Sequence, residues 1–382
     1  MLVDKNGIED FGKSLENEIN EITEKIYTAV GYEFNLNSPK QLGVALFEKL
    51  GLPHGKKTKT GYSTGAEVLE KLRYDSEVVD DLLRYRTITK LKSTYCDGLL
   101  RVVSDDERVH STFKQTETRT GRLSSTEPNI QNIPVRTQLG RQMRKFFKAS
   151  DGCVLVDADY SQIELRVLAH IANDERMKQA FISGEDIHTT TASQVFGLPE
   201  DMVTSEMRSR AKAVNFGIVY GIGAFSLSKD IGVTMSESKA YIDGYLSTFS
   251  GVADYMQKVV EDAKKTGFVT TTFGRRRYLP ELSMSNHNMR AFGERVARNM
   301  PIQGTAADII KIAMNRVLSR LTKEGLKAKL ILQVHDELIC EAPESERETV
   351  ERILREEMES AVDFSVPLTV DVKSGKTWFD TK

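Results

Sequence analysis

The chain reads Cys-Val-Leu-Val-Asp-Ala-Asp-Tyr over residues 153–160. The apolar run 153–156 is typical of a buried strand, and the pattern of residues 161–172 predicts a helix directly after it. Side chains alternate between the two faces of a strand, so Asp157 and Asp159 are expected on the same face. This stretch therefore predicts a buried strand that carries two carboxylates at its end.

A second pair of acids, Asp336 and Glu337, lies between the apolar runs 329–334 and 338–341. This arrangement predicts a strand–turn–strand unit with both acids at its tip. With a last strand expected over 368–372, the strands form a small antiparallel sheet from two distant segments of the chain. The predicted fold class is α+β, because helical insertions precede and separate those segments.

Outside the sheet, apolar residues recur mostly at helical spacing. Helices are predicted over 8–30, 40–50, 65–72, 76–95, 207–220, 236–249, 291–322 and 344–361. The helix over 291–322 is expected to be interrupted at Pro301, since proline lacks a backbone N–H. A strand is expected over 108–113 and a small hairpin around Gly274.

The composition is that of an ordinary globular protein. The 382 residues are 40% hydrophobic and 28% charged, which is enough chain for two or three subdomains. The three cysteines are widely spaced and predict neither a disulfide framework nor a zinc site, so a reducing compartment fits best. The apolar runs are too short to span a membrane, and the polar first residues do not resemble a secretory signal.

The charge distribution is more informative than the net charge of −2, which by itself argues weakly against nucleic-acid binding. Basic residues gather over 54–59, 114–148 and 275–277, whereas acids gather over 344–359. A basic face of this kind suits a phosphate-bearing partner. Solvated surface charge is the alternative interpretation of each cluster.

The strand-end carboxylates are candidate metal ligands. Carboxylates at the ends of buried strands are unfavourable unless they are paired or bind a metal ion, and hard oxygen ligands suit Mg²⁺. Two such ions about 4 Å apart can bind both the attacking and the leaving oxygen of a displacement at phosphorus. Acids exposed to solvent are the alternative. An Asp-x-Asp pattern also occurs in other nucleotide-handling enzymes, so it does not by itself select the reaction.

A stripe of unusual composition lies in the helix predicted over 207–220. Arg208, Lys212, Phe216 and Tyr220 follow at four-residue steps and so form a slowly drifting line on one face. Arginine and lysine can bind a triphosphate, and an aromatic ring can pack against a base or sugar. The alternative is an amphipathic helix with solvated cations and core aromatics.

Several segments resemble the motifs of family A DNA polymerases. Asp-Tyr-Ser-Gln-Ile-Glu-Leu-Arg over 159–166 is similar to the first polymerase motif, residues 208–221 resemble the second, and 335–337 resemble the third. Further similarity lies over 90–95 (the thumb of the family), 120–125, 128–134 and 303–308. The resemblance covers nearly the whole chain, and the motifs occur in the order found in the family.

The resemblance implies a catalytic centre with two Mg²⁺ ions. Asp159, Asp336 and the backbone carbonyl of Tyr160 would bind the ions, and Glu337 would lie beside them in support. Asp157 falls just outside the family motif and is treated as secondary.

The resemblance also implies a nucleotide site. Arg208 and Lys212 would bind the incoming triphosphate, and Lys212 would donate a proton to the leaving pyrophosphate. His188 would contact a phosphate, and Glu164 would exclude ribonucleotides by closing the space beside the 2′ position of the sugar. The full implied set of nucleotide-binding residues is Tyr160, Gln162, Glu164, His188, Arg208, Lys212, Phe216 and Tyr220.

A DNA contact surface completes the implied site. Its residues would touch primer–template DNA in the minor groove near the new base pair, where acceptors shared by all correct pairs report geometry rather than sequence. They are Arg122, Arg295, Asn299, Gln303 and His335.

The implied function is template-directed addition of deoxynucleotides to a primer 3′-hydroxyl, with release of pyrophosphate. The expected partners are primer–template DNA and dNTPs, and no membrane association is expected. The protein is expected to be a monomer that acts in replication and repair in the bacterial cytoplasm, at the nucleoid. A single-subunit RNA polymerase and a metal-dependent nuclease are the alternatives, and Glu164 and Phe216 favour deoxynucleotides over ribonucleotides. A non-catalytic DNA-binding module is the least favoured alternative, because every acid of the motifs is present.

The family plan predicts the subdomains as well. A helical thumb is expected over 1–103, a palm built on the antiparallel sheet over 104–166 and 296–382, and helical fingers over 167–295. Neither a proofreading nor a 5′-nuclease domain is expected within these 382 residues.

Overall fold

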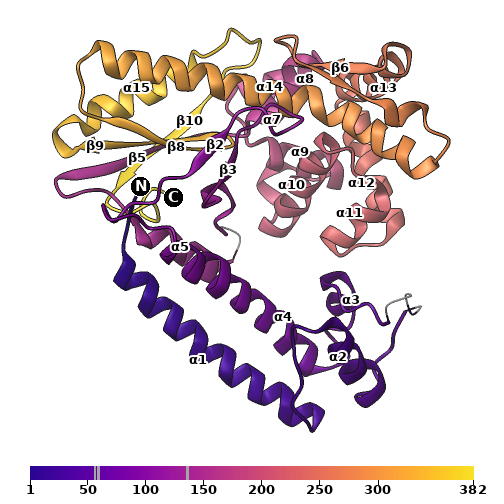
Figure 1. The fold of residues 1–382 in the computed structure, drawn as a ribbon. Coiled ribbons are helices and arrows are strands. Elements are labelled where there is room, and N and C mark those ends of the chain that lie inside the picture. Colours follow the sequence, from indigo (N-terminus) through magenta and orange to yellow (C-terminus); the bar gives the residue numbers. More distant parts are fainter. Residues whose placement is uncertain (56, 58–60, 135–136) are drawn as a thin grey trace. The chain divides into compact units, whose positions relative to one another are not determined.

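The computed structural model describes residues 1–55, 57, 61–134 and 137–382. Parts of two predicted basic clusters therefore lie outside the described residues, namely Lys56, Lys59 and Arg136. The chain forms two compact units, seen in Figure 1. The first unit contains 1–111 and 127–148, and the second contains 112–126 and 149–382. The first unit holds the whole segment predicted as the thumb, but the second does not separate palm from fingers, so the predicted boundaries stay a prediction.

The first unit is mostly helical. Its longest helix, α1 (Lys5–Val30), begins where the Asp4 carboxylate accepts a hydrogen bond from Gly7 N at 3.2 Å, and it ends at Gly31, whose φ of 88° suits glycine. Helix α1 packs against α4 (Glu77–Lys90) through buried aliphatic residues such as Ile22. The predicted helix over 8–30 is thus confirmed.

The other elements of this unit are short. They are β1 (Leu2–Val3), which pairs with β4 (Phe147–Lys148), α2 (Pro39–Gly43), α3 (Ala66–Lys71), α5 (Gly98–Leu100), α6 (Gln138–Gln142), π-helical turns at Val44–Lys49 and Leu91–Asp97, and 3₁₀ turns at Ile130–Asn132 and Met143–Phe146.

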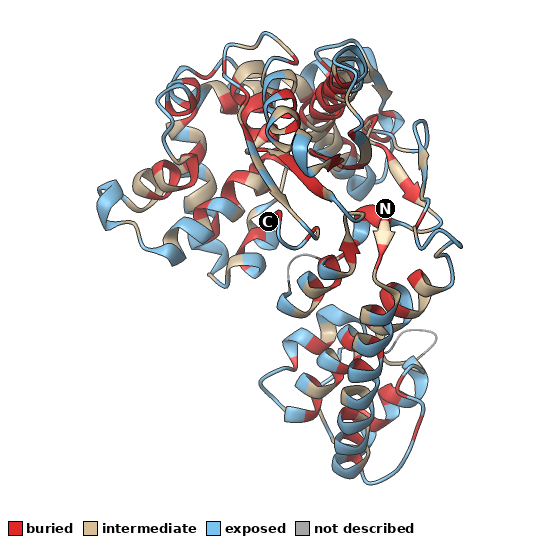
Figure 2. Ribbon diagram, turned by 90° about the vertical axis from the view of Figure 1, so that its left-hand side faces the viewer, coloured by how far each residue is buried: buried red, intermediate tan, exposed pale blue. Residues whose placement is uncertain are grey.

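The second unit is built on a four-stranded antiparallel sheet, as predicted. Its strands are β5 (Cys153–Tyr160), β8 (Lys329–Val334), β9 (Glu337–Pro343) and β10 (Val370–Gly375), in the order β10-β5-β9-β8. Buried residues, red in Figure 2, run along most of β5 and β9 and along the second half of β8. The apolar run ends at residue 156, whereas β5 continues through both acids to Tyr160.

Two helices pack on the sheet (Figure 1): α14 (His287–Lys323) and α15 (Arg347–Glu359). On β5, Val154, Val156 and Ala158 belong to the core that these helices share. Because side chains alternate, the acids at 157 and 159 lie on the opposite face of the sheet. The helices thus leave that face available for a site.

Helix α14 is continuous through Pro301, so the predicted interruption there was wrong. Proline removes one hydrogen bond from a helix and can bend it. In this helix Met300, Pro301 and Ile302 are all buried. Packing along 37 residues outweighs one missing hydrogen bond.

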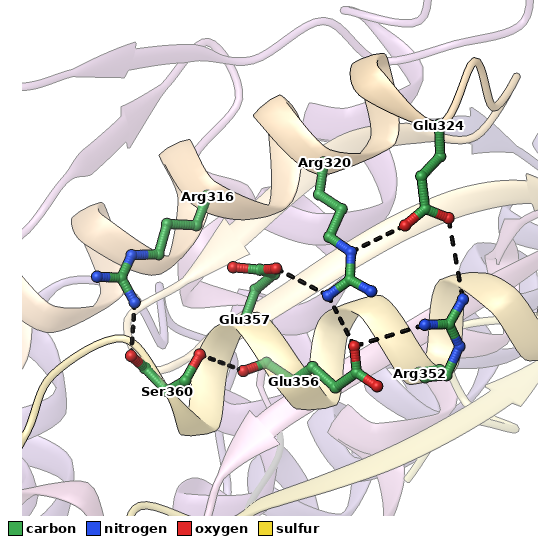
Figure 3. A network of polar contacts seen from close by, with 7 residues as sticks. All are labelled: Arg316, Arg320, Glu324, Arg352, Glu356, Glu357 and Ser360. Carbon is green, nitrogen blue, oxygen red and sulfur yellow. Dashed lines mark hydrogen bonds and ion pairs between the residues drawn. The ribbon is translucent and has the colours of Figure 1, made fainter.

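The contact between α14 and α15 includes a network of charges, drawn in Figure 3. Arg320 reaches Glu324, the residue that follows α14, at 2.9 Å, and Glu356 and Glu357 on α15 at 2.7 and 2.9 Å. Arg352 lies 3.5 Å from Glu356 and so extends the network. These pairs link the two helices.

The remaining elements of the second unit are helices and two small hairpins. The helices are α7 (Ile163–Ile171), α8 (Glu175–Ile182), α9 (Ile187–Phe196), α10 (Ser205–Val219), α11 (Ala224–Ile231), α12 (Met235–Thr248) and α13 (Ser250–Thr266), with 3₁₀ turns at Glu200–Met202, Pro280–Ser283 and Glu344–Glu346. The hairpins pair β2 (Thr112–Lys114) with β3 (Ser124–Thr126), and β6 (Phe268–Thr270) with β7 (Arg276–Tyr278).

The hairpin around Gly274 is confirmed, whereas the strand predicted over 108–113 is mostly wrong. Only its last two residues enter β2, and Arg108 forms an isolated bridge with Leu2. The alternating pattern there reflects local burial of Val109 rather than a continuous strand. Helices and an antiparallel sheet together confirm the α+β class. Among the described residues, no helix has the length and apolar character needed to cross a bilayer.

Candidate active site

The pairing of β5 with β9 brings the predicted carboxylates together. Asp159 lies opposite Glu337 in the register, and Tyr160 N donates to the carbonyl oxygen of Asp336 at 3.1 Å. Asp336 and His335 form the tight turn between β8 and β9, where His335 has a φ of 62°. Two segments far apart in the sequence thus place Asp159 and Asp336 side by side, as predicted.

The two carboxylates lie in an environment that disfavours their charge. Burial, followed by the nearby charge of Asp159, raises the pKa of Asp336 to about 7. Burial also raises the pKa of Asp159. Among the described residues, the Asp336 carboxylate has no hydrogen bond or ion pair. A divalent cation between these oxygens would supply the missing charge, so the residues fit a hard metal ion.

Asp159 and Asp336 are the carboxylates that could bind such an ion. Among the described residues, no group of three or more His, Cys, Asp or Glu side chains has the arrangement of a metal site. A site at Asp159 and Asp336 therefore depends on further oxygen ligands, for which the backbone of Tyr160, next to Asp159 at the end of β5, is one candidate. The ring of Tyr160 is buried, and its hydroxyl donates to Met358 O at 2.7 Å.

The C-terminal segment closes one side of this cluster, which the sequence analysis did not foresee. Lys382 Nζ lies 3.1 Å from Asp157 Oδ2, 3.1 Å from Glu337 Oε2 and 3.5 Å from Asp159 Oδ2. The indole N–H of Trp378 donates to Glu337 at 2.8 Å. Glu337 and Asp157 thus have protein partners, which distinguishes them from Asp336.

The stripe on α10 forms a second, cationic group. Thr204 caps the helix by accepting a hydrogen bond from Met207 N at 3.2 Å, and Arg208 donates to Asp186 Oδ2 at 2.5 Å. Lys212 follows one turn later. The positive charges of both cations act on His188 of α9, where they oppose its protonation.

His188 joins this group from the neighbouring helix. Its ring lies 5.9 Å from the ring of Phe216, centroid to centroid. Burial, assisted by Lys212 and Arg208, lowers the pKa of His188 to about 4, although Asp186 acts in the opposite direction. At neutral pH the imidazole is therefore uncharged in a cluster that presents two cations.

Three more predicted residues, Arg122, Glu164 and Tyr220, lie close to one another between the carboxylates and α10. Glu164 Oε1 accepts from Arg122 Nη2 at 2.6 Å, and the Glu164 side chain is only 7% exposed. Burial, with Glu164 as the next cause, raises the pKa of Tyr220 to about 12, which places the phenol beside that carboxylate. Gln162 begins α7 with a φ of 55°, the bend that turns the chain from β5 into the helix.

The predicted DNA contacts lie on α14 and beside it. Arg295, Asn299 and Gln303 follow at four-residue steps on one helix face. Asn299 Nδ2 lies 3.5 Å from Val219 O at the end of α10, and the backbone of Gly221 approaches Arg295 closely. Burial lowers the pKa of His335, and the positive charge of Arg122 is the next cause, so these two residues also lie near each other. All predicted site residues belong to the second unit.

One predicted basic cluster, 275–277, faces solvent only in part. Arg275 donates to Asp308 Oδ1 on α14 through Nε at 3.0 Å and Nη2 at 2.7 Å, and Thr271 donates to Oδ2 at 2.8 Å. Arg276 stacks over Phe268 at 4.9 Å from the ring centroid. Asp308 fixes the β6–β7 hairpin to α14, a role that no spacing in the sequence indicated.

Comparisons with known proteins identify relatives of this chain. A family model described as DNA polymerase family A matches residues 5–380. DNA polymerase I of Bacillus subtilis (strain 168) is 54% identical over 382 residues, covering the whole chain and 43% of the relative. DNA polymerase I of Bacillus caldotenax is 53% identical and is covered over 44% of its length. The chain thus spans less than half the length of these curated relatives.

A solved structure extends the likeness to the fold. The POL domain of Pol1 from M. smegmatis, in complex with DNA primer–template and dNTP, superposes with a TM-score of 0.95 at 44% identity. The alignment covers the whole chain and 68% of that structure. The predicted fold, an antiparallel-sheet palm with helical fingers and thumb, is thereby confirmed.

Proposed function

This chain belongs to DNA polymerase family A, and on that premise we propose that it extends a primer by template-directed addition of deoxynucleotides. The observation that supports the proposal most strongly is the pairing of β5 with β9, which sets Asp159 beside Asp336. The cations of α10 belong to the same unit as that pair. Nucleotidyl transfer requires both kinds of group, one that binds metal ions and one that binds the anionic phosphates.

The proposed metal site uses the residues that fit it. Asp159 and Asp336, with the backbone carbonyl of Tyr160, would bind two Mg²⁺ ions, which when bound would acidify the primer 3′-hydroxyl and neutralise the leaving pyrophosphate. Glu337 would hold its place through Trp378 and Lys382 rather than bind metal directly.

The chain's own side chains would bind and orient the triphosphate. Arg208 would exchange its Asp186 partner for phosphate oxygens, and Lys212 would donate a proton to the bridging oxygen as pyrophosphate leaves. Phe216 would pack on the sugar and Tyr220 beside the nascent base pair. Much of the rate enhancement would come from this positioning and charge stabilisation.

Selection of deoxynucleotides would depend on Glu164. Arg122 holds its carboxylate in place at 2.6 Å, so the side chain is a fixed wall rather than a mobile one. A 2′-hydroxyl that entered this space would meet a buried carboxylate whose Oε1 already accepts a hydrogen bond from Arg122. This geometry favours DNA synthesis over the alternative of an RNA polymerase.

Contacts with the duplex are proposed for Arg295, Asn299 and Gln303 on α14, together with Arg122 and His335. Their side chains come from a single helix face and from loops beside the carboxylates. In the minor groove such donors would test the geometry of the new pair. Because the curated relatives are bacterial polymerases, we also propose a monomer that acts at the bacterial nucleoid.

Primer extension in Mg²⁺ tests the proposal. The wild type should extend a primer with dNTPs, and Asp336→Ala should abolish extension. Asp371→Asn is the matched control, because Asp371 is an exposed carboxylate on β10 that lies opposite Asp159 in the register. Undiminished extension by Asp336→Ala would refute the metal assignment.

The same samples separate the alternatives. Equal use of dNTPs and rNTPs would support an RNA polymerase, and shortening of the primer without any nucleotide would support a nuclease. Failure of both extension and degradation by a folded wild type would exclude all three activities.

A further inference from the structure

The buried contact between α9 and α10 contains a polar chain that joins His188 to Asn215 and Thr191, two residues that the proposed mechanism does not use. Asn215 Nδ2 lies 3.0 Å from His188 Nδ1, and Thr191 Oγ1 lies 3.2 Å from Asn215 Oδ1. The exposed fractions of these residues are 0% for Asn215, 1% for Thr191 and 2% for His188. Buried polar side chains are retained where their hydrogen bonds are satisfied, so this chain has a definite donor order.

The donor order decides which nitrogen of the ring carries the proton. An amide N–H that points at Nδ1 requires a lone pair there, so the single proton of the neutral ring must lie on Nε2. The Thr191 hydroxyl has one proton and two acceptors within reach, Ile187 O at 2.6 Å and Asn215 Oδ1 at 3.2 Å. When that proton is directed at Oδ1, it keeps the amide oxygen of Asn215 turned away from the ring.

The electrostatic surroundings make the neutral ring the relevant form. Arg208 and Lys212 on α10 oppose protonation of His188, as burial does, and the Asp186 carboxylate on α9's cap acts against them. The balance lowers the pKa of His188 to about 4. An imidazolium would also place an N–H at Nδ1, directly against the amide N–H of Asn215.

We propose that Asn215 is a positioning residue that fixes His188 as the neutral Nε2–H tautomer, ready to donate a hydrogen bond to a phosphate oxygen. Among the described residues, Nε2 has no hydrogen-bond partner, so in this tautomer its N–H is not committed to another protein group. The inference rests on the proposed function in that the phosphate is taken to belong to the incoming triphosphate. The tautomer itself is a property of the free protein.

Nitrogen-15 NMR of the free protein, with histidine labelled, tests the tautomer directly. The chain has six histidines, so a His188→Gln sample assigns the resonance. A wild-type His188 with a pyrrole-type Nε2 and a pyridine-type Nδ1 supports the inference. The opposite pattern, or a charged ring at pH 7, overturns it, whatever the polymerase assay shows.

Variants of Asn215 test whether this residue is the cause. Asn215→Asp replaces the donor by an acceptor of the same shape, so His188 should change to the Nδ1–H tautomer or become charged. Asn215→Leu removes the interaction and should yield mixed tautomers, with KM for dNTP raised about ten-fold and primer–template affinity unchanged. An unaltered His188 spectrum in both variants overturns the assignment to Asn215.

Thr191→Val provides a second variant should the Asn215 variants fold poorly. Valine is close in shape and lacks only the hydroxyl, so the amide loses its orienting donor and His188 should show both tautomers. A His188 spectrum identical to the wild type in a folded Thr191→Val protein would show that the amide orientation has another cause and would overturn the role given to Thr191. If the NMR results hold but the wild type shows no primer extension, the proposed function fails and the tautomer assignment stands.

Discussion

The ion pair between Arg275 and Asp308 supports a quantitative prediction about the stability of the second unit. The Asp308 side chain is 9% exposed and accepts three hydrogen bonds, two of them from the Arg275 guanidinium, which is 38% exposed. Hydrogen bonds to charged groups contribute about 1.5–3 kcal/mol. Solvent around the guanidinium screens the pair, so the lower end of that range applies.

We expect Asp308→Asn to lower the free energy of unfolding by about 2 kcal/mol. Arg275→Met should lower it by a similar or larger amount, because it leaves a buried carboxylate with Thr271 as its remaining partner. The double variant should lose less than the two single losses together, by about 1.5 kcal/mol. Arg276→Met is the control, because its stacking on Phe268 contributes no more than about 1 kcal/mol.

Urea unfolding followed by tryptophan fluorescence measures these values. The chain has one tryptophan, Trp378, which is fully buried in the same unit as the ion pair. The fluorescence change therefore reports that unit alone. Additive losses in the double variant, with a coupling below about 0.5 kcal/mol, would refute the claim that the pair fixes the hairpin to α14.

Three further predictions concern the site. The pKa of His188 is lower in the folded protein than the value of about 6.5 in the unfolded chain, so protonation below pH 6.5 favours the unfolded state. As the pH falls to 4, the free energy of unfolding of the wild type should therefore decrease by up to about 3 kcal/mol more than that of His188→Phe. Urea titrations at several pH values would measure this difference. Glu164→Ala should raise ribonucleotide incorporation roughly ten-fold or more in single-nucleotide extension, and unchanged discrimination would contradict its role. Lys382→Met removes a cation 3.5 Å from Asp159, so Mn²⁺ affinity measured by electron paramagnetic resonance should rise roughly ten-fold; weaker binding would show instead that Lys382 orients the carboxylates.

The sheet and its acids were predictable because their patterns are local. Period-two alternation placed Asp157 and Asp159 on one face, and two apolar runs around Asp336 predicted the β8–β9 turn. The union of the two segments was also expected, although only the register of β5 with β9 shows which acids are neighbours.

What escaped sequence analysis depends on contacts between residues distant in the chain. Lys382 carries no local pattern, yet it lies against three carboxylates. Asn215 belongs to no sequence pattern that singles it out, and its significance comes from His188 on the neighbouring helix. Pro301 misled because a local rule about proline was outweighed by burial along the whole helix.

The pairing of β5 with β9 also has a consequence for how the molecule acquires activity. Residues 161–328 lie between β5 and β8, so the two carboxylates meet only after a very long loop has closed. Pairings of such high sequence separation form slowly compared with helices. During refolding from urea, helical circular dichroism should therefore return before primer extension does. Competence for catalysis would be among the last properties the chain gains, and the first lost when the sheet opens.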